Sequence, residues 1–270
     1  MKLMIGMALI AVMMTLWVPD GSWADVHLKR DCRMDAERVP AKDKTAEKTV
    51  EELWITREGI RIDAPGKSMI IFSFPRELVL LDHGKKILIR KDLKENPARF
   101  QVMAGKDAKK NELMEEIRNS MLNIETVVRD TEEMKNIRGW NCRKYIMTFK
   151  TFMGEMEQEV WATQDLKISK KFSDLLMTSM IYDLPGMEYN LRETKSKMRE
   201  IQGVPVNIIS TRKMMRQSHR RICELTEFKE AAAPADLLKI PADYQENQAP
   251  DGVTQGLPAG TPKPSDQSPE

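Results

Sequence analysis

Residues 139–163, GWNCRKYIMTFKTFMGEMEQEVWAT, decide the fold of this chain. Within this stretch Tyr145, Met147 and Phe149 alternate with polar side chains, which is the period of a strand with one buried face. Gly154 marks a short turn, and the apolar residues near the end of the stretch form a return strand. The stretch therefore predicts a β-hairpin with one face committed to a protein interior.

The sequence before this hairpin has the pattern of an antiparallel meander. In the first predicted strand, residues 50–56, Leu53 and Ile55 fall on one face and Trp54 on the other. Short apolar runs follow, separated by turn residues such as Pro65-Gly66, where proline presets φ and glycine accepts a positive φ. These runs predict further strands over residues 60–62, 69–74, 77–81 and 86–90.

Three stretches have helical spacing of apolar residues instead. They are residues 109–121, a stripe from Phe172 to Met180, and a stripe from Met187 to Met198. Strands resume over residues 124–129, 204–211 and 221–228, and residues 231–244 read as a short helical turn followed by an apolar plug that closes one end of the sheet. This mixture predicts an α+β protein.

The first 24 residues have the order of a secretory signal peptide. Lys2 precedes the apolar run 3–18, and a small-x-small cleavage site ends at Ala24. The alternative is an uncleaved anchor helix, although the run is shorter than the roughly 20 residues that span a bilayer comfortably. We expect a periplasmic or secreted protein that is cleaved near Ala24.

The rest of the chain divides by composition. Residues 25–47 are a polar N-terminal segment, residues 48–244 form one domain, and residues 245–270 form a Pro-rich tail that is too poor in apolar residues to fold. The formal net charge of the whole chain is only +2. We therefore expect no nucleic-acid partner, because no global field would attract one.

Signatures of catalysis and metal binding are absent from the sequence. It contains no GxSxG, HExxH, CxxC or phosphate-cradling GxxxxGK motif. None of its three histidines, His27, His83 and His219, has a second His or Cys at ligand spacing. We expect no catalytic residues, no metal and no cofactor. The basic run 212–221 either contacts an acidic partner such as anionic lipid head groups or faces water.

Three cysteines, Cys32, Cys142 and Cys223, would meet an oxidising compartment after export. A disulfide between Cys142 and Cys223 is the favoured pairing, because both fall in predicted strands. Three pairings are open, and all three residues can also be small buried hydrophobes.

Residues 139–145 and 159–163, together with 59–63 and 234–244, resemble a domain-of-unknown-function family of exported bacterial proteins. That family looks related to the LolA/LolB-like superfamily of periplasmic lipoprotein carriers and receptors. The resemblance covers about residues 48–244 and implies a curved antiparallel β-sheet, a half-barrel, whose concave side is covered by helices. The helical stretches around 168–200 depart from the pattern of the lipoprotein carriers.

The leading functional hypothesis is a non-enzymatic envelope protein that holds an apolar ligand, such as a lipid or acyl chain, between sheet and helices. The chain has twenty methionines, whose side chains adapt to ligands of varied shape. Candidate lining residues are large apolar groups on predicted strands: Trp54, Ile60, Ile62, Tyr145, Met147 and Trp161. The alternative is a structural or protein-interaction module of the envelope, with a core filled by its own side chains.

Overall fold

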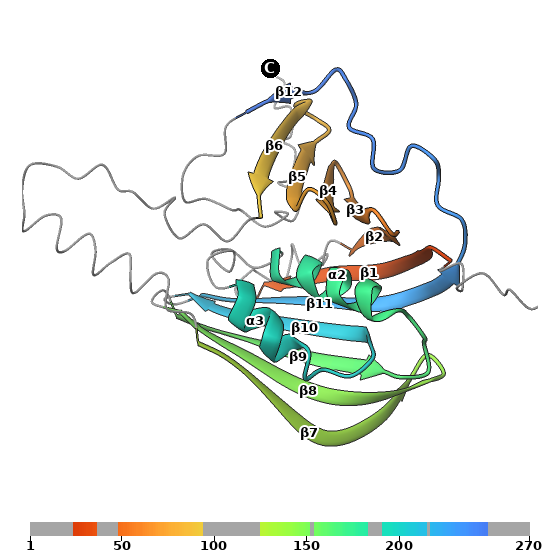
Figure 1. The fold of residues 1–270 in the computed structure, drawn as a ribbon. Helices are drawn as coiled ribbons and strands as arrows, with labels where there is room; N and C mark the ends of the chain where they lie inside the picture. The colour runs from red at the N-terminus through yellow and green to blue at the C-terminus, as the bar shows by residue number, and fades with distance from the viewer. Residues whose placement is uncertain are drawn as a thin grey trace, which may run out of the picture.

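A computed structural model describes residues 24–36, 48–93, 125–151, 154–182, 191–214 and 217–247. It shows one open sheet of twelve strands in the order β12-β6-β5-β4-β3-β2-β1-β11-β10-β9-β8-β7 (Figure 1). Neighbouring strands are antiparallel except β12, which runs parallel to β6. β12 and β7 are therefore the two edges of the sheet.

The strands differ in length between the two halves of the sheet. The shorter strands are β2 (Lys48–Ile55), β3 (Gly59–Ala64), β4 (Lys67–Phe72), β5 (Glu77–Asp82), β6 (Ile87–Asp92) and β12 (Gln245–Glu246). The longer strands are β1 (Val26–Ala36), β7 (Glu125–Ile137), β8 (Trp140–Thr151), β9 (Gly154–Thr163), β10 (Val204–Met214) and β11 (Gln217–Glu230). The helices are α2 (Lys170–Tyr182) and α3 (Leu191–Met198).

The expected α+β half-barrel with a helix-covered concave side is wrong. The sheet is open and carries most of the described chain, whereas α2 and α3 contain only 13 and 8 residues. Helical spacing had indicated that helices exist, but the two helices among the described residues are too short to cover twelve strands. The helix expected over 109–121, and Met187 of the third helical stripe, lie outside the described residues.

The central hairpin is confirmed. It consists of β8 and β9, which pair from Cys142↔Thr163 to Thr151↔Gly154. Tyr145, Met147 and Phe149 are buried, as their alternation predicted. The meander from β2 to β6 is confirmed as well, since each of these strands pairs with the next one along the chain.

The sheet begins earlier than the expected domain start at residue 48. The segment that looked polar contains β1, which pairs with β2 on one side and with β11 on the other. Its buried residues Val26, Leu28 and Cys32 do alternate, but charged residues lie between them. β1 therefore joins the two halves of the sheet at its centre.

The two faces of the sheet have different roles. We call the face that carries Leu53, Ile62 and Tyr145 the inner face, and the face that carries Trp54 and Lys144 the outer face. The inner face holds the main core, to which α2 and α3 contribute buried side chains. These helical side chains are Phe172, Leu176, Met177, Met180, Ile181 and Met198. Neither described helix is long and apolar enough to cross a membrane.

A smaller apolar cluster lies on the outer face of β4, β5 and β6. Its buried strand residues are Ile70, Val79, Leu81 and Leu88. Residues 231–247, which we call the C-terminal strap, run from the end of β11 to β12 beside β6 (Figure 1). The strap places Leu238, Ile240 and Tyr244 on this cluster, which confirms the expected apolar plug.

The helices belong to an excursion, residues 164–203, that leaves and rejoins the sheet between two paired strands. Thr163 at the end of β9 pairs directly with Val204 at the start of β10. Gly203 closes the excursion with a φ of 97°. A Cβ there would lie 2.1 Å from the carbonyl oxygen of Thr163, so only glycine allows the chain to return at this point.

Candidate functional site

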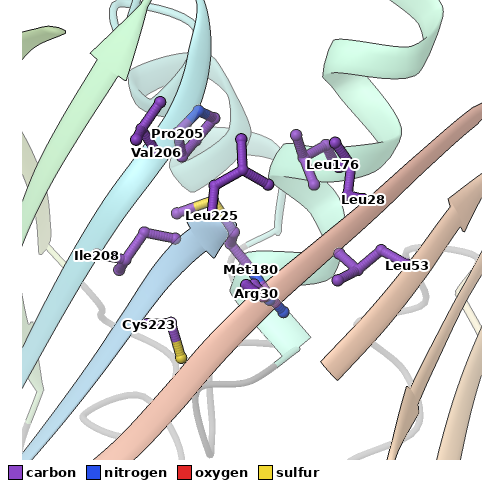
Figure 2. A pocket seen from close by; sticks show the side chains of 10 residues that line it. All are labelled: Leu28, Arg30, Leu53, Leu176, Met180, Pro205, Val206, Ile208, Cys223 and Leu225. Carbon is purple, nitrogen blue, oxygen red and sulfur yellow. The ribbon is translucent and has the colours of Figure 1, made fainter. Parts of the chain in front are cut away.

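A small cavity lies on the inner face, between α2 and the strands at the centre of the sheet (Figure 2). It is lined by Leu28, Arg30, Leu53, Leu176, Met180, Pro205, Val206, Ile208, Cys223 and Leu225. Its free space is about that of one water molecule. Nine of these residues are apolar, so Arg30 supplies the charged part of the wall.

Strand register explains why these side chains meet. Leu28 of β1 lies opposite Leu53 of β2, and Arg30 lies opposite Leu225 of β11. β10 contributes two adjacent residues, Pro205 and Val206, because its register with β9 shifts at this point. Such a bulge turns consecutive side chains toward one face.

A charged cluster adjoins the cavity. The Nε of Arg30 donates to Oε2 of Glu51 at 2.8 Å, and Arg221 donates to the other carboxylate oxygen. Arg30 and Glu51 are only 7% and 3% exposed. Burial of unpaired charges would cost several kcal/mol. The charge-assisted hydrogen bonds offset this cost and fix both side chains.

The charge state of Glu51 follows from two opposing effects. Burial raises the pKa of the Glu51 carboxyl, because the charged form loses water. The positive charges of Arg30 and Arg221 lower it by more, so its pKa lies below the ordinary value. Glu51 is therefore ionised at neutral pH.

The disulfide joins Cys32 to Cys223, and Cys142 is a buried free thiol. The favoured pairing of Cys142 with Cys223 was wrong, because β9 and β10 separate β8 from β11 in the sheet. Cys32 and Cys223 are instead direct cross-strand partners of β1 and β11. Burial raises the pKa of the Cys142 thiol, which makes it a poor nucleophile.

The sulfur atoms of this disulfide and a carboxylate oxygen of Glu51 lie within 4.8 Å of one another. In the oxidised state this group does not make a metal site. The sulfur atoms are bonded to each other rather than present as thiolates, which are the form that binds metals. Glu51 is also held by two guanidinium groups, which would repel a cation.

The structure divides the six expected lining residues between the two faces. Four are fully or almost fully buried in the main core: Ile60, Ile62, Tyr145 and Met147. The other two, Trp54 and Trp161, point to the outer face of their strands, although Trp161 is only 8% exposed and belongs to the same core cluster. Trp54 stacks on His27 with ring centroids 4.3 Å apart. Trp161 pairs across the strands with Lys144, and its Nε1 donates to Glu159 at 2.7 Å. None of the six lines the cavity described above.

The residues that the sequence interpretation missed are Arg30, Glu51 and Arg221. A signal existed for Glu51, because it continues the alternation of Leu53 and Ile55 toward the inner face. Arg30 likewise stands in the buried phase of β1, between Leu28 and Cys32. Charged residues in a buried phase look like a break in the apolar pattern, although they belong to it.

A second polar network, on the outer face, resembles a catalytic group without being one. Asp63 only accepts hydrogen bonds, so the hydroxyl of Ser68 must donate to it. Ser68 Oγ then accepts from His83 Nε2 at 2.7 Å, and His83 Nδ1 accepts from the Tyr244 hydroxyl at 2.5 Å. The serine proton points away from the histidine, and Ser68 is fully buried. This network fastens the C-terminal strap to the sheet.

The comparisons with known proteins give a family and no activity. The model of a family described as Domain of unknown function (DUF4412) matches residues 56–244. No curated protein matches the chain.

Proposed function

The chain belongs to the DUF4412 family, whose description assigns no function, and we propose from its site that it is an exported, non-enzymatic protein that binds an apolar ligand. The ligand would lie between α2 and the inner face of the sheet. The observation that carries this proposal is the apolar cavity beneath α2, with its single charged wall residue, Arg30.

The side chains around this cavity suit a ligand of variable shape. Met69, Met147, Met177, Met180 and Met198 are all buried in the main core, and Met180 also lines the cavity. Methionine is flexible and polarisable, so such a wall can repack around different apolar groups. Burial of the ligand would contribute about 25 cal/mol per Å² of apolar surface.

The cavity must enlarge before such a ligand fits, because its present space is about that of one water molecule. The chain offers a way to do so. α2 belongs to the excursion between Thr163 and Val204, and a shift of α2 breaks no strand pairing. We propose that the ligand displaces Leu176 and Met180 from the inner face and takes their place.

Dye binding to matched variants of α2 tests this function. Leu176→Trp adds bulk inside the cavity, and Lys170→Trp adds the same ring at an exposed position of the same helix. We expect a naphthylamine dye to bind saturably to the wild type, about tenfold more weakly to Leu176→Trp and unchanged to Lys170→Trp. Absence of saturable binding to the wild type, or equal loss in both variants, would contradict the proposal.

A second candidate function is a structural or protein-interaction module with no ligand. The small size of the described cavity favours it, since side chains of the chain itself fill the inner face there. The dye titration separates the two functions. A relationship to the LolA/LolB-like superfamily stays a prediction, because the family match does not include it and the half-barrel that it implied is wrong.

A further inference from the structure

We infer that the exposed edge of β7 is an interface through which two copies of the chain join their sheets, with residues 125–129 of each copy paired antiparallel about Val127. The inference does not depend on the proposed ligand, because the cavity lies at the centre of the sheet and β7 lies at its edge. Figure 1 shows β7 as the lowest strand of the long half, with no described strand beyond it.

The two edges of the sheet differ in how they are closed. At β6 the C-terminal strap supplies β12, and the backbone N–H groups of Gln245 and Asn247 donate to the carbonyl oxygens of Lys86 and Leu88 at 2.9 Å. At β7 no backbone group of the described residues forms a hydrogen bond from the side away from β8. An edge of this kind presents a row of unpaired N–H and C=O groups to a further strand.

A bulge limits the part of β7 that can pair with a further strand. The register with β8 shifts between Asp130 and Met134. Inside the bulge the N–H of Glu132 donates to Asp130 Oδ1 at 2.9 Å, and the N–H of Glu133 donates to Thr131 Oγ1 at 3.3 Å. A bulge disrupts the ladder, and these local hydrogen bonds occupy its donors. Residues 125–129, which pair regularly with β8, remain as the pairing segment.

The sequence of this segment, ETVVR, is complementary to itself about Val127. When the segment runs antiparallel to its own copy, Glu125 lies opposite Arg129 of the second copy, and this contact occurs twice. The two Val127 side chains then face each other, and each is 41% exposed in the single chain. Opposite charges and β-branched residues in such positions stabilise an antiparallel pair.

Other antiparallel registers lose this match. Pairing centred on Glu125 or on Arg129 would place two like charges opposite each other, which is destabilising. Pairing centred on Thr126 or on Val128 would place a charged side chain opposite Val127. Charges on an edge strand usually prevent association, whereas here their order selects one register.

The contact of Glu125 within its own chain is compatible with this interface. Its Oε2 lies 3.2 Å from Nζ of Lys150, on the neighbouring strand β8. A carboxylate has two oxygens and can accept hydrogen bonds from more than one donor. Glu125 can therefore keep Lys150 on one side and accept from Arg129 of the second copy on the other.

Sedimentation velocity of the purified protein at concentrations from about 1 to 200 µM tests the interface. A pairing of residues 125–129 buries little surface, so we expect a weak, reversible dimer with a dissociation constant on the order of 10–100 µM. The weight-average sedimentation coefficient should rise across this range toward that of a dimer. A coefficient that stays at the monomer value throughout would overturn the inference and leave the proposed function standing.

Charge variants assign the dimer to β7. Arg129→Glu turns both contacts with Glu125 into repulsions, and we expect the dissociation constant to rise at least about tenfold. Arg76→Glu makes the same change of charge at the exposed turn between β4 and β5 and should leave the constant unchanged. Glu125→Arg/Arg129→Glu restores opposite charges and should recover most of the lost affinity. An unaffected dimer in Arg129→Glu, or no recovery in the double variant, would overturn the inference.

A cysteine at the centre of the interface reports the register. Cys32 and Cys223 show that direct cross-strand partners of this sheet can form a disulfide. Val127→Cys should therefore give a disulfide-linked dimer on oxidation with copper phenanthroline, because residue 127 faces its own copy. Glu125→Cys is the matched control, since residue 125 faces residue 129 of the second copy, and it should run as a monomer on non-reducing gels. No preference for Val127→Cys over Glu125→Cys would overturn the proposed register.

Discussion

On the inner face Glu51 is 3% exposed and bound by two arginines, whereas its neighbour Glu52 faces the other way and pairs with Lys29 on the outer face at 2.9 Å. The side chains of Lys29 and Glu52 are 34% and 45% exposed. Adjacent carboxylates on one strand therefore meet opposite surroundings. A charged side chain is buried and paired at Glu51 on the inner face, and it is exposed to solvent at Glu52 on the outer face. The position of a residue in the strand alternation decides which of these surroundings its charge meets.

The faces also differ in what covers them. The excursion with α2 and α3 packs on the inner face, while the strap packs on the outer face of the short strands. On the longer strands the outer face carries ion pairs such as Lys144 with Glu159. Pairs of this exposed kind contribute little to stability.

The largest expected difference in stability between the two faces is the one between substitutions of Glu51 and of Glu52. Glu51→Ala leaves the buried guanidinium of Arg30 and the partly buried one of Arg221 without their shared carboxylate, and we expect a loss of about 3–5 kcal/mol in the free energy of unfolding. Glu52→Ala breaks a solvent-screened pair and should cost less than about 1 kcal/mol. Urea unfolding followed by circular dichroism measures both, and equal losses would contradict the assignment of Glu51 to a buried cluster.

The dependence of unfolding free energy on pH gives a second test of the difference between Glu51 and Glu52. The pKa of Glu51 lies below its ordinary value in the folded protein, because the arginines lower it by more than burial raises it. Its contribution to stability is therefore complete above the unfolded-state pKa of about 4.3 and is lost as the pH falls through the lower, folded-state pKa. Glu51→Gln should flatten the decline of unfolding free energy as the pH falls below about 4.5. A parallel decline in wild type and variant would contradict this.

The disulfide of the inner face is expected to have the next largest effect. It links residues 191 positions apart, and its loss in Cys32→Ser/Cys223→Ser should cost about 2–5 kcal/mol. Peptide mapping under non-reducing conditions should recover Cys32 joined to Cys223, with Cys142 alkylated only after unfolding. A Cys142-containing linkage would contradict the described register.

A substitution of Gly203 tests how the excursion, residues 164–203, rejoins the sheet. Gly203→Ala would force a Cβ against the Thr163 carbonyl, and we expect a loss of about 3 kcal/mol. Gly139→Ala is the matched control, because Gly139 also has a positive φ but has nothing within 4 Å of an added Cβ. It should cost about 1 kcal/mol. Equal thermal shifts would mean that the return of the excursion tolerates a side chain.

The smallest effect belongs to the strap on the outer face. Tyr244→Phe removes the hydroxyl that donates to His83, and we expect a loss of about 1 kcal/mol. Limited proteolysis should show faster cleavage within residues 231–247, while the rest of the sheet keeps its resistance. Cleavage that begins elsewhere would show that this hydrogen bond does not hold the strap in place.

Much of the sheet could be predicted from the sequence. The alternation in β8 and the turn residues between β3 and β6 identify the hairpin and the meander, and the apolar residues of 237–244 identify the plug. β1 escaped because His27, Lys29 and Asp31 stand between its buried residues. A strand with one apolar face looks polar when the residues of its other face are polar or charged.

The site could be predicted less well, for a physical reason. Arg30, Glu51 and Arg221 are distant in sequence, and only the order β2-β1-β11 brings them together. The cavity depends on the register shift that turns Pro205 and Val206 toward one face. Apolar alternation predicts which residues are buried, but it contains no information on which strands are neighbours. It also placed Trp54 and Trp161 among the lining residues by size alone.

Native mass spectrometry of the protein, purified without detergent from its own cells, tests the central claim most directly. The account predicts a population heavier than the bare chain by the mass of one apolar ligand, which organic solvent extracts. A single population at the mass of the bare chain, under conditions that preserve non-covalent complexes, would contradict the account.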